Sequence, residues 1–232
     1  MKKDFLNKIY LGITGENNSD WQLKLKEISE RKIDSVAVFL ERFEKDEREF
    51  LRRSLLESTV KHVPLVHLRN DTGIDELEFF AAHFNTRHFN IHENSFDFIE
   101  QWNGHLDKLY LEMNYDNAIP VNVVVEKIGG FCVDLAHLKS AIDREAVDAD
   151  FILERKNMAK FACNHLNGYS AAEKWDLHFV TDLKDFDYLT SLPKYVFGDI
   201  IALELDNSIE DQIKFRDRIA GVLGDYFSKD IG

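Results

Sequence analysis

Residues 131–138, FCVDLAHL, carry an apolar run directly into an acid and, three residues later, an imidazole. Phe131, Cys132 and Val133 have the composition of a buried strand, and Asp134 follows them without a break. A carboxylate beside a buried strand is costly unless a partner compensates its charge. Three arrangements suit the pattern: a metal ion shared with His137, a hydrogen bond between the two side chains, or a helix capped by Asp134.

Runs of similar β-rich character recur along the chain and are separated by longer segments with helical spacing. Eight strands are predicted, at residues 8–15, 34–41, 63–70, 87–93, 108–114, 129–137, 160–167 and 198–206. Helices are predicted at 19–32, 45–58, 74–84, 95–104 and 208–228, and the link 115–128 has the weakest helical pattern. The expected caps are Ser19 or Asp20, Ser95, and Ser208 with Asp211 in capping-box spacing. The helix at 45–58 is expected to place Phe50, Leu51, Leu55 and Leu56 on one face.

Strands that alternate with helices favour a parallel sheet covered by those helices. Eight such units within 232 residues indicate an α/β fold, a single (β/α)₈ TIM barrel. One domain is expected to occupy residues 1–232, with the barrel strands within about 8–206 and the last helix at 208–228. An open doubly wound sheet is the alternative, but GITGENN at 12–18 lacks the glycine spacing of a phosphate loop.

The composition narrows the classes of partner. The formal net charge of −13 repels polyanions and argues against duplex DNA, so a small-molecule substrate is expected. Cys132 and Cys163 both lie in apolar runs, which indicates buried core residues and excludes a disulfide framework. No segment approaches the ~20 apolar residues that cross a bilayer, so a soluble, cytoplasmic protein is expected. Nothing in the helical surfaces indicates an oligomeric state.

Residue types that bind metals occur near the C-terminal ends of six consecutive predicted strands. They are His67, His92, Glu112, Asp134 with His137, His165, and Glu204. The loop after the seventh strand adds Asp176 and His178. Because a (β/α)₈ barrel gathers the ends of its strands around one mouth, these side chains are expected to converge there.

The chemistry of this set suits a divalent cation. Imidazoles and carboxylates bind Zn²⁺, Mn²⁺ or Fe, and so many buried anions would repel one another without a cation. Each residue alone has an ordinary structural explanation, as a core histidine, a salt-bridge partner or a helix cap; the metal prediction rests on their joint occurrence. Four further histidines precede strands or lie on helices and are interpreted as surface or packing residues: His62, His83, His88 and His105.

These motifs resemble the xylose isomerase-like TIM-barrel superfamily, and within it the endonuclease IV (AP endonuclease family 2) branch. The resemblance extends over about residues 9–206, and it is sharpest in CVDLAH (132–137), NHLN (164–167), the Asp-x-His of 176–178 and ALELD (202–206). LEMN (111–114) corresponds to the strand-five motif of that family.

The resemblance implies one to three metal ions, Zn²⁺ or Mn²⁺, and a division of the ligands among them. His67, His92 and Glu112 would hold the first metal, and Glu112 would bridge to the second. The second metal would be completed by Asp134, His165 and Glu204, and the third would be held by His137, Asp176 and His178. In this family a hydroxide between the metals attacks a phosphorus atom, which implies hydrolysis of a phosphoester.

Two departures from the family motifs bear on the substrate. Gly168 follows HLN where the family usually carries Asp, and Leu177 stands where the DNA-cutting enzymes carry Arg. The loops are also expected to be short, whereas bending a duplex requires many phosphate contacts. The first hypothesis is therefore a metal-dependent hydrolase of a small phosphorylated molecule, with Glu112, Glu204 and His137 as the catalytic residues.

The alternative is a sugar isomerase or epimerase of the same superfamily. In that case a single Mn²⁺ or similar ion would bind Glu112, Asp134, His165 and Glu204. Glu112 and Glu204 would exchange protons on opposite faces of a substrate carbon, and His137 would contact the sugar. A non-catalytic barrel that keeps its metal site as a remnant is a third, lesser alternative.

Overall fold

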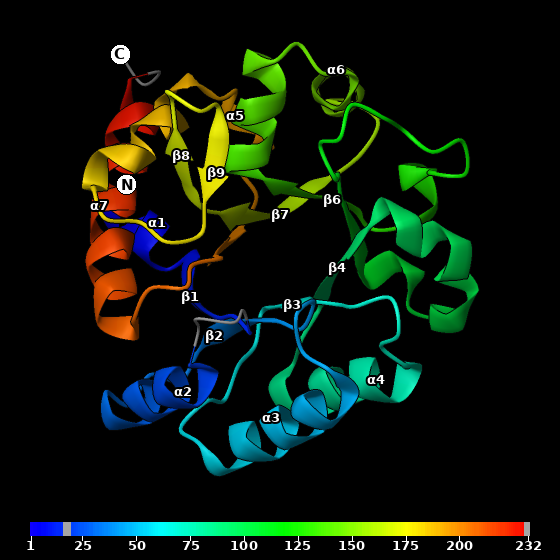
Figure 1. Cartoon of the computed structure of the whole chain (residues 1–232), viewed down its shortest axis with the longest axis vertical. Coiled ribbons are helices and arrows are strands. Elements are labelled where there is room, and N and C mark those ends of the chain that lie inside the picture. The colour runs from blue at the N-terminus through cyan, green and yellow to red at the C-terminus, as the bar shows by residue number, and fades with distance from the viewer. Residues whose placement is uncertain (16–19, 230–232) are drawn as a thin grey trace.

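The computed structural model describes residues 1–15 and 20–229. Within these ranges, eight parallel strands close into a barrel in the order β1-β10-β7-β6-β5-β4-β3-β2 (Figure 1). The barrel strands are β1 (Ile9–Ile13), β2 (Val36–Phe39), β3 (Leu65–His67), β4 (His88–His92), β5 (Leu109–Glu112), β6 (Gly130–Asp134), β7 (Phe161–Leu166) and β10 (Ile200–Leu203). Each strand lies in a run predicted from the sequence, and the (β/α)₈ prediction is confirmed.

Helices surround the barrel and a separate antiparallel hairpin, β8 (Gly168–Ser170) with β9 (Trp175–Leu177), follows β7 (Figure 1). The α-helices are α1 (Lys2–Leu6), α2 (Trp21–Glu30), α3 (Lys45–Glu57), α4 (Ile74–Phe84), α5 (Leu135–Asp143), α6 (Val147–Glu154) and α7 (Ile209–Ser228). The 3-10 helices are η1 (Glu93–Trp102), η2 (Leu106–Lys108), η3 (Val125–Lys127), η4 (Leu183–Ser191) and η5 (Lys194–Val196). None of the described helices is long and apolar enough to cross a membrane.

Local signals in the sequence explain where the helices begin. Asp20 caps α2 by accepting a hydrogen bond from the Leu23 amide at 2.9 Å, and Ser208 caps α7 through the Asp211 amide at 3.1 Å, as expected. The alternative cap Ser19 lies outside the described residues. Each such cap stabilises a helix by about 1 kcal/mol.

Two connections differ from the sequence prediction. Residues 95–104 fall in and just after η1 rather than in an α-helix, and Ser95 is no cap, since its hydroxyl lies 2.5 Å from Asn70 Oδ1. Between β5 and β6, residues 113–129 contain only the short η3, so this loop is longer than expected. Tyr115 and Asn117 adopt positive φ angles of 55° and 65°, which interrupts any right-handed helix there.

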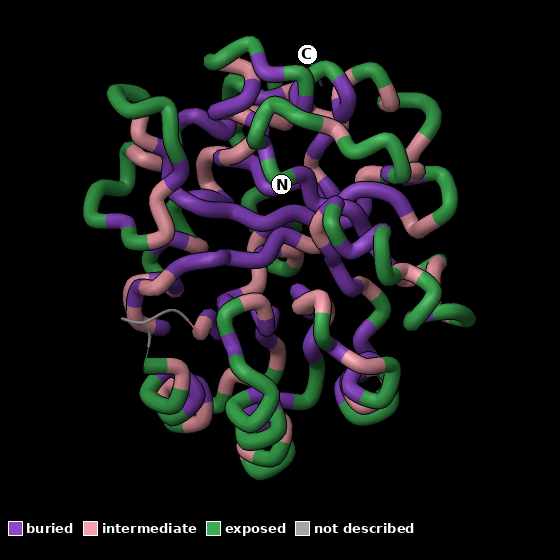
Figure 2. Tube along the Cα trace, turned by 45° about the vertical axis from the view of Figure 1, so that its right-hand side comes forward, coloured by how far each residue is buried: buried purple, intermediate pink, exposed green. Residues whose placement is uncertain are grey.

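The apolar core lies in two places, inside the barrel and between the barrel and its helices. Successive side chains of a strand point to opposite faces, so Ala37 and Phe39 of β2 join the inner cluster while Val36 and Val38 join the outer one. Figure 2 shows these buried strands at the centre, with exposed residues on the outer faces of the helices. Of the four residues predicted to share one face of α3, only Leu51 and Leu55 are buried; Phe50 and Leu56 are about half exposed, which corrects the predicted face.

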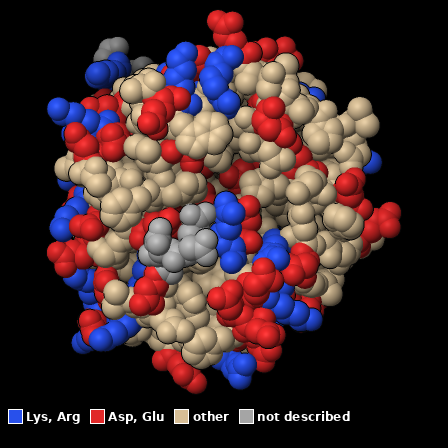
Figure 3. Space-filling view, viewed as in Figure 1, with Lys and Arg blue, Asp and Glu red and all other residues tan. Residues whose placement is uncertain are grey.

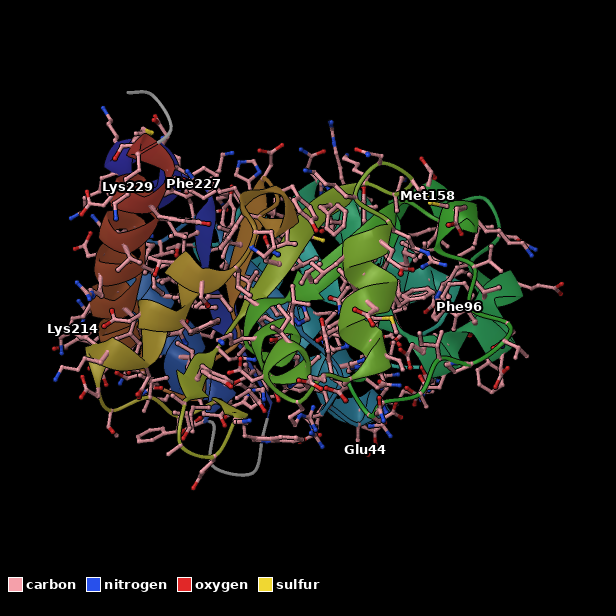
Figure 4. All side chains as sticks on the ribbon, turned by 90° about the horizontal axis from the view of Figure 1, so that it is seen from above. Glu44, Phe96, Met158, Lys214, Phe227 and Lys229 are labelled. Atoms are coloured by element: carbon pink, nitrogen blue, oxygen red, sulfur yellow. The ribbon has the colours of Figure 1, made fainter. Side chains whose placement is uncertain are left out.

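The C-terminal helix packs against the first strand of the barrel. The Gln212 side chain accepts from the Gly12 amide at 2.8 Å and donates to the Gly12 carbonyl at 3.1 Å. Gly12 permits the close approach of β10, because a Cβ there would lie 1.9 Å from the Leu203 carbonyl oxygen. In Figure 4, which views the molecule from above, α7 lies at one edge, with the Lys214 label below that of Lys229.

Candidate metal centre

All nine residues predicted as ligands lie at the C-terminal mouth of the barrel. His67, His92, Glu112 and Asp134 are the last residues of β3, β4, β5 and β6. The strand register sets His92 beside Glu112 and Asp134 beside His165. The remaining members belong to the segments that follow the strands, namely His137 on α5, Asp176 on β9, His178 after β9 and Glu204 after β10.

The most buried group consists of Glu112, Asp134, His165 and Glu204, each of which offers a ligand atom within 4.8 Å of the others. His165 Nδ1 lies 3.1 Å from Glu112 Oε1 and 3.2 Å from Glu204 Oε2. Burial lowers the pKa of His165, but the two carboxylates outweigh it and hold that pKa well above the ordinary value. Burial also raises the pKa of Asp134 to about 6. The group carries more negative than positive charge, and a bound cation would balance the excess.

Two asparagines orient the candidate ligands of this group. Asn90 donates from Nδ2 to Glu112 Oε2 at 2.7 Å, and its Oδ1 lies 3.1 Å from His165 Nε2. An asparagine carbonyl can only accept, so Nε2 carries a proton, and Nδ1 faces the carboxylates. Asn167 donates to Asp134 Oδ2 at 2.7 Å. Such partners fix the tautomer and direction of metal ligands.

The carboxylate of Asp134, which ends the apolar run of FCVDLAHL, has two roles. β6 ends at Asp134, so His137 lies on α5 and not in the predicted strand 129–137. Asp134 Oδ1 caps α5 by accepting from the His137 amide at 2.8 Å. The other oxygen, Oδ2, lies 3.8 Å from His137 Nδ1, inside the ligand group. The helix cap and a cation partner are therefore compatible.

A second group is formed by Glu41, His67 and His92, whose ligand atoms lie within 4.8 Å of one another. Both ring nitrogens of His67 are buried without a hydrogen-bond partner, and its Nδ1 is 3.8 Å from Glu112 Oε2. Burial lowers the pKa of His67 to about 4, against the opposing pull of Glu112, so the ring is neutral. A buried imidazole with both nitrogens unpaired is unfavourable by about 1–3 kcal/mol unless something binds them.

The third group, His137, Asp176 and His178, depends on the β8–β9 hairpin. The hairpin register pairs Asp176 with Tyr169, and this places the carboxylate 3.4 Å from His137 Nε2 and 2.8 Å from His178 Nε2. Burial opposes charge on both imidazoles, but nearby carboxylates raise the pKa of His137 to about 9 and that of His178 to about 10. The two imidazoles hold the pKa of Asp176 well below its usual range, although burial raises it.

Sequence reasoning missed three members of this centre. Glu41 lies two residues after the end of β2, at the same end as the predicted ligands, so its position was available as a signal. Asn90 lies two residues before His92 and therefore shares its strand face. Asn167 is the last residue of the NHLN motif. The ligand groups found among the described residues are the three above and an overlapping group of His67, His165 and Glu204. The histidines interpreted as surface or packing residues lie outside all of them: His62, His83, His88 and His105.

Members of all three groups line one cavity of about 300 Å³ at the barrel mouth, but Asp134 and His165 of the central group are not among its lining residues. Phe39 lies at its base, with its ring centroid 4.9 Å from that of His165. Arg42 and Trp175 are exposed residues of the lining. The residues fit bound divalent ions on two counts, the unpaired nitrogens of His67 and the packing of three carboxylates around His165.

Comparisons with known proteins support the fold. The structure of a D-tagatose 3-epimerase-like protein matches with a TM-score of 0.55 and 13% sequence identity over 95% of this chain and 99% of that chain. The structure of SacUVDE matches with a TM-score of 0.43 and 15% identity over 88% of this chain and 84% of that chain. No protein-family model matches the chain, and no curated protein matches it in sequence. The first of these matches supports the barrel fold of the chain.

Proposed function

We propose that this protein is a divalent-metal-dependent hydrolase of a small phosphoester, with more than one metal ion at the mouth of the barrel. The observation that carries the proposal is the presence of two further ligand groups beside the central one. A single-metal enzyme has no use for His137, Asp176 and His178 as a complete three-ligand group. Multi-metal sites of this kind clamp both the attacking and the leaving oxygen of a phosphoryl group.

Each of the three ligand groups would hold one metal ion. The central ion would be held by Glu112, Asp134, His165 and Glu204, the second by His67 and His92 with Glu41 or Glu112, and the third by His137, Asp176 and His178. Zn²⁺ and Mn²⁺ both suit these donors. Bound divalent ions would supply Lewis acidity at the phosphoryl oxygens and a nucleophilic water at neutral pH.

The chain itself contributes orientation, charge and exclusion of water. Asn90 holds Glu112 and His165 in one arrangement, so these two side chains are already oriented before the reaction. Arg42 brings a guanidinium to the lining of an otherwise acidic cavity, where it can bind a phosphate oxygen. The apolar ring of Phe39 covers the inner end of the cavity.

The size of the cavity and the surface charge favour a small substrate. A volume of about 300 Å³ is at the lower end of ligand sites. The chain carries a net charge of −13, and Figure 3 shows basic side chains in small separate groups among acidic ones. A duplex needs a continuous basic track for its phosphates, so we do not propose duplex DNA as the substrate. A cytoplasmic location remains our expectation.

A second candidate, a single-metal sugar epimerase, is favoured by one observation. The group of Glu112, Asp134, His165 and Glu204 is complete by itself, and both glutamates lie within 3.2 Å of His165 Nδ1. Glu112 and Glu204 would then exchange protons with a carbon of the sugar. The similar structure is that of a D-tagatose 3-epimerase-like protein, which makes ketose sugars the first substrates to test.

Turnover of bis(p-nitrophenyl) phosphate and of D-tagatose by Mn²⁺- or Zn²⁺-loaded protein separates the candidates. A hydrolase predicts phosphoester cleavage that falls about 100-fold or more in His178→Ala, since that change dismantles the third group. The matched control is His83→Ala, an exposed histidine on α4, which should retain wild-type activity. Epimerisation that survives His178→Ala would instead establish the second candidate. If the protein turns over neither compound, the result would favour the third alternative, a non-catalytic barrel.

A further inference from the structure

The proposed chemistry gives no role to one aromatic side chain at the rim of the metal cavity. Trp175, the first residue of β9, is 53% exposed and lines the cavity together with Asp176 and His178. The other aromatic ring of the lining, Phe39, is 3% exposed and packs against the ligands. The cavity thus combines a polar, metal-binding interior with one large exposed indole at its edge.

The backbone around Trp175 is fixed against helix α5. Ser140 donates from its hydroxyl to the Lys174 carbonyl at 2.6 Å, and Lys174 Nζ donates to the Asp143 carbonyl at 2.9 Å. Lys174 has a positive φ of 54° and donates its amide to the Ser170 carbonyl at 2.8 Å, which closes the hairpin turn. A rim residue held in this way loses little freedom when a ligand binds to it.

One side of the indole is covered by a cation. The Arg144 guanidinium carbon lies 5.3 Å from the Trp175 ring centroid. Arg144 is itself held, because Nη2 donates to the Tyr115 carbonyl at 3.0 Å and Nε donates to the Ser140 carbonyl at 3.3 Å. A guanidinium stacked on one side of an indole leaves the other side of the ring available for a ligand.

We propose that Trp175, backed by Arg144, is a stacking platform for a planar ring of the substrate, and that the site selects phosphoesters that carry a nucleobase. The phosphoester part of this proposal rests on the proposed function above. The phosphate would lie among the ligand groups and Arg42, and the base would lie on the exposed side of Trp175. Aromatic stacking of a base contributes about 1–3 kcal/mol, which is enough to dominate selection among phosphorylated compounds.

The test compares two ligands that share a phosphate and differ by a base. Binding of adenosine 5′-monophosphate and of ribose 5-phosphate to the metal-loaded full chain is measured by titration calorimetry. Wild-type protein is expected to bind the nucleotide at least tenfold more tightly. Trp175→Ala should remove this preference and leave the affinity for ribose 5-phosphate within about twofold, while Trp175→Phe should keep part of it.

A matched control is available two residues after β9. Phe179 is 63% exposed but does not line the cavity, so Phe179→Ala should preserve the preference for the nucleotide. Arg144→Ala, which removes the support of the indole, should reduce the preference by a smaller factor than Trp175→Ala. Equal affinity for the two ligands in wild type, absence of nucleotide binding, or a preference retained in Trp175→Ala would overturn the proposal.

The failure of this proposal can be told apart from failure of the proposed function. Phosphoester cleavage that depends on His178, without a preference for the nucleotide, would sustain the hydrolase and refute the platform. A preference lost in Trp175→Ala, without any phosphoester cleavage, would sustain the platform and refute the hydrolase.

Discussion

Replacing His67 by phenylalanine should have opposite effects on the metal-free and the metal-loaded protein. Both ring nitrogens of His67 are buried without a partner, and the nearest carboxylate oxygen, Glu112 Oε2, lies 3.8 Å from Nδ1. Phenylalanine has a similar shape and no polar atoms, and the site is already walled by the ring of Phe39, with ring centroids 6.3 Å apart. In metal-free protein the substitution removes the cost of an unsatisfied buried group.

The expected gain in metal-free protein is about 1–3 kcal/mol of unfolding free energy. For a chain of this length that corresponds to a rise of roughly 3–9 °C in Tm. In metal-loaded protein the same variant loses a ligand, so the stabilisation that the wild type gains from added Zn²⁺ or Mn²⁺ should shrink.

Thermal unfolding in chelator and in excess metal, for wild type, His67→Phe and His83→Ala, measures both effects. The exposed His83 should respond in neither condition. The reasoning would be refuted by a His67→Phe variant that is less stable than wild type in chelator and gains as much from metal as wild type does.

Three other predictions concern the framework around the centre. Glu76→Ala should lower the unfolding free energy by about 3 kcal/mol in urea denaturation, because it removes the buried carboxylate partner of the Arg48 guanidinium, whose Nη2 lies 3.0 Å from Glu76 Oε1, and leaves only the exposed carboxylate of Asp71; an unchanged midpoint would contradict this. Gly12→Ala should lower the unfolding free energy by at least about 3 kcal/mol in the same measurement, since its Cβ would lie 1.9 Å from the Leu203 carbonyl oxygen. A Gly12→Ala variant as stable as wild type would refute the close approach of the two strands. Burial lowers the pKa of His88 from 6.5 to about 4, so the unfolded chain binds more protons in that range, and stability should fall as pH drops from about 6.5 to about 4. In chelator His88→Phe should flatten this decline by about 1–2 kcal/mol after screening of the partly exposed ring, and an identical pH profile would argue against it.

The barrel could be predicted from the sequence because each of its strands gives a strong local signal. Each barrel strand is a short β-rich run, and the number of such runs nearly determines the closed architecture. The β8–β9 hairpin has strands of three residues each, too short to show a periodicity. The loop from 113 to 129 contains the left-handed residues Tyr115 and Asn117. Asparagine adopts this conformation readily, but a bulky residue such as tyrosine seldom does, so residue type gave no signal at Tyr115.

The convergence of the candidate ligands was predictable for a similar reason. Once the strands are parallel and closed, a residue at the C-terminal end of one strand lies near those of its neighbours. Glu41 escaped notice because an acid after a strand is usually a solvated surface residue. The split into three groups depends on side-chain directions, as for Asp176, which reaches both His137 and His178 from the hairpin.

The number of metal ions per chain tests the central claim most directly. Elemental analysis of protein purified without chelator is expected to give two or three equivalents of zinc or manganese, and His178→Ala is expected to lose one of them. A single equivalent that is lost in Glu112→Gln but is unaffected by His178→Ala would contradict the multi-metal centre.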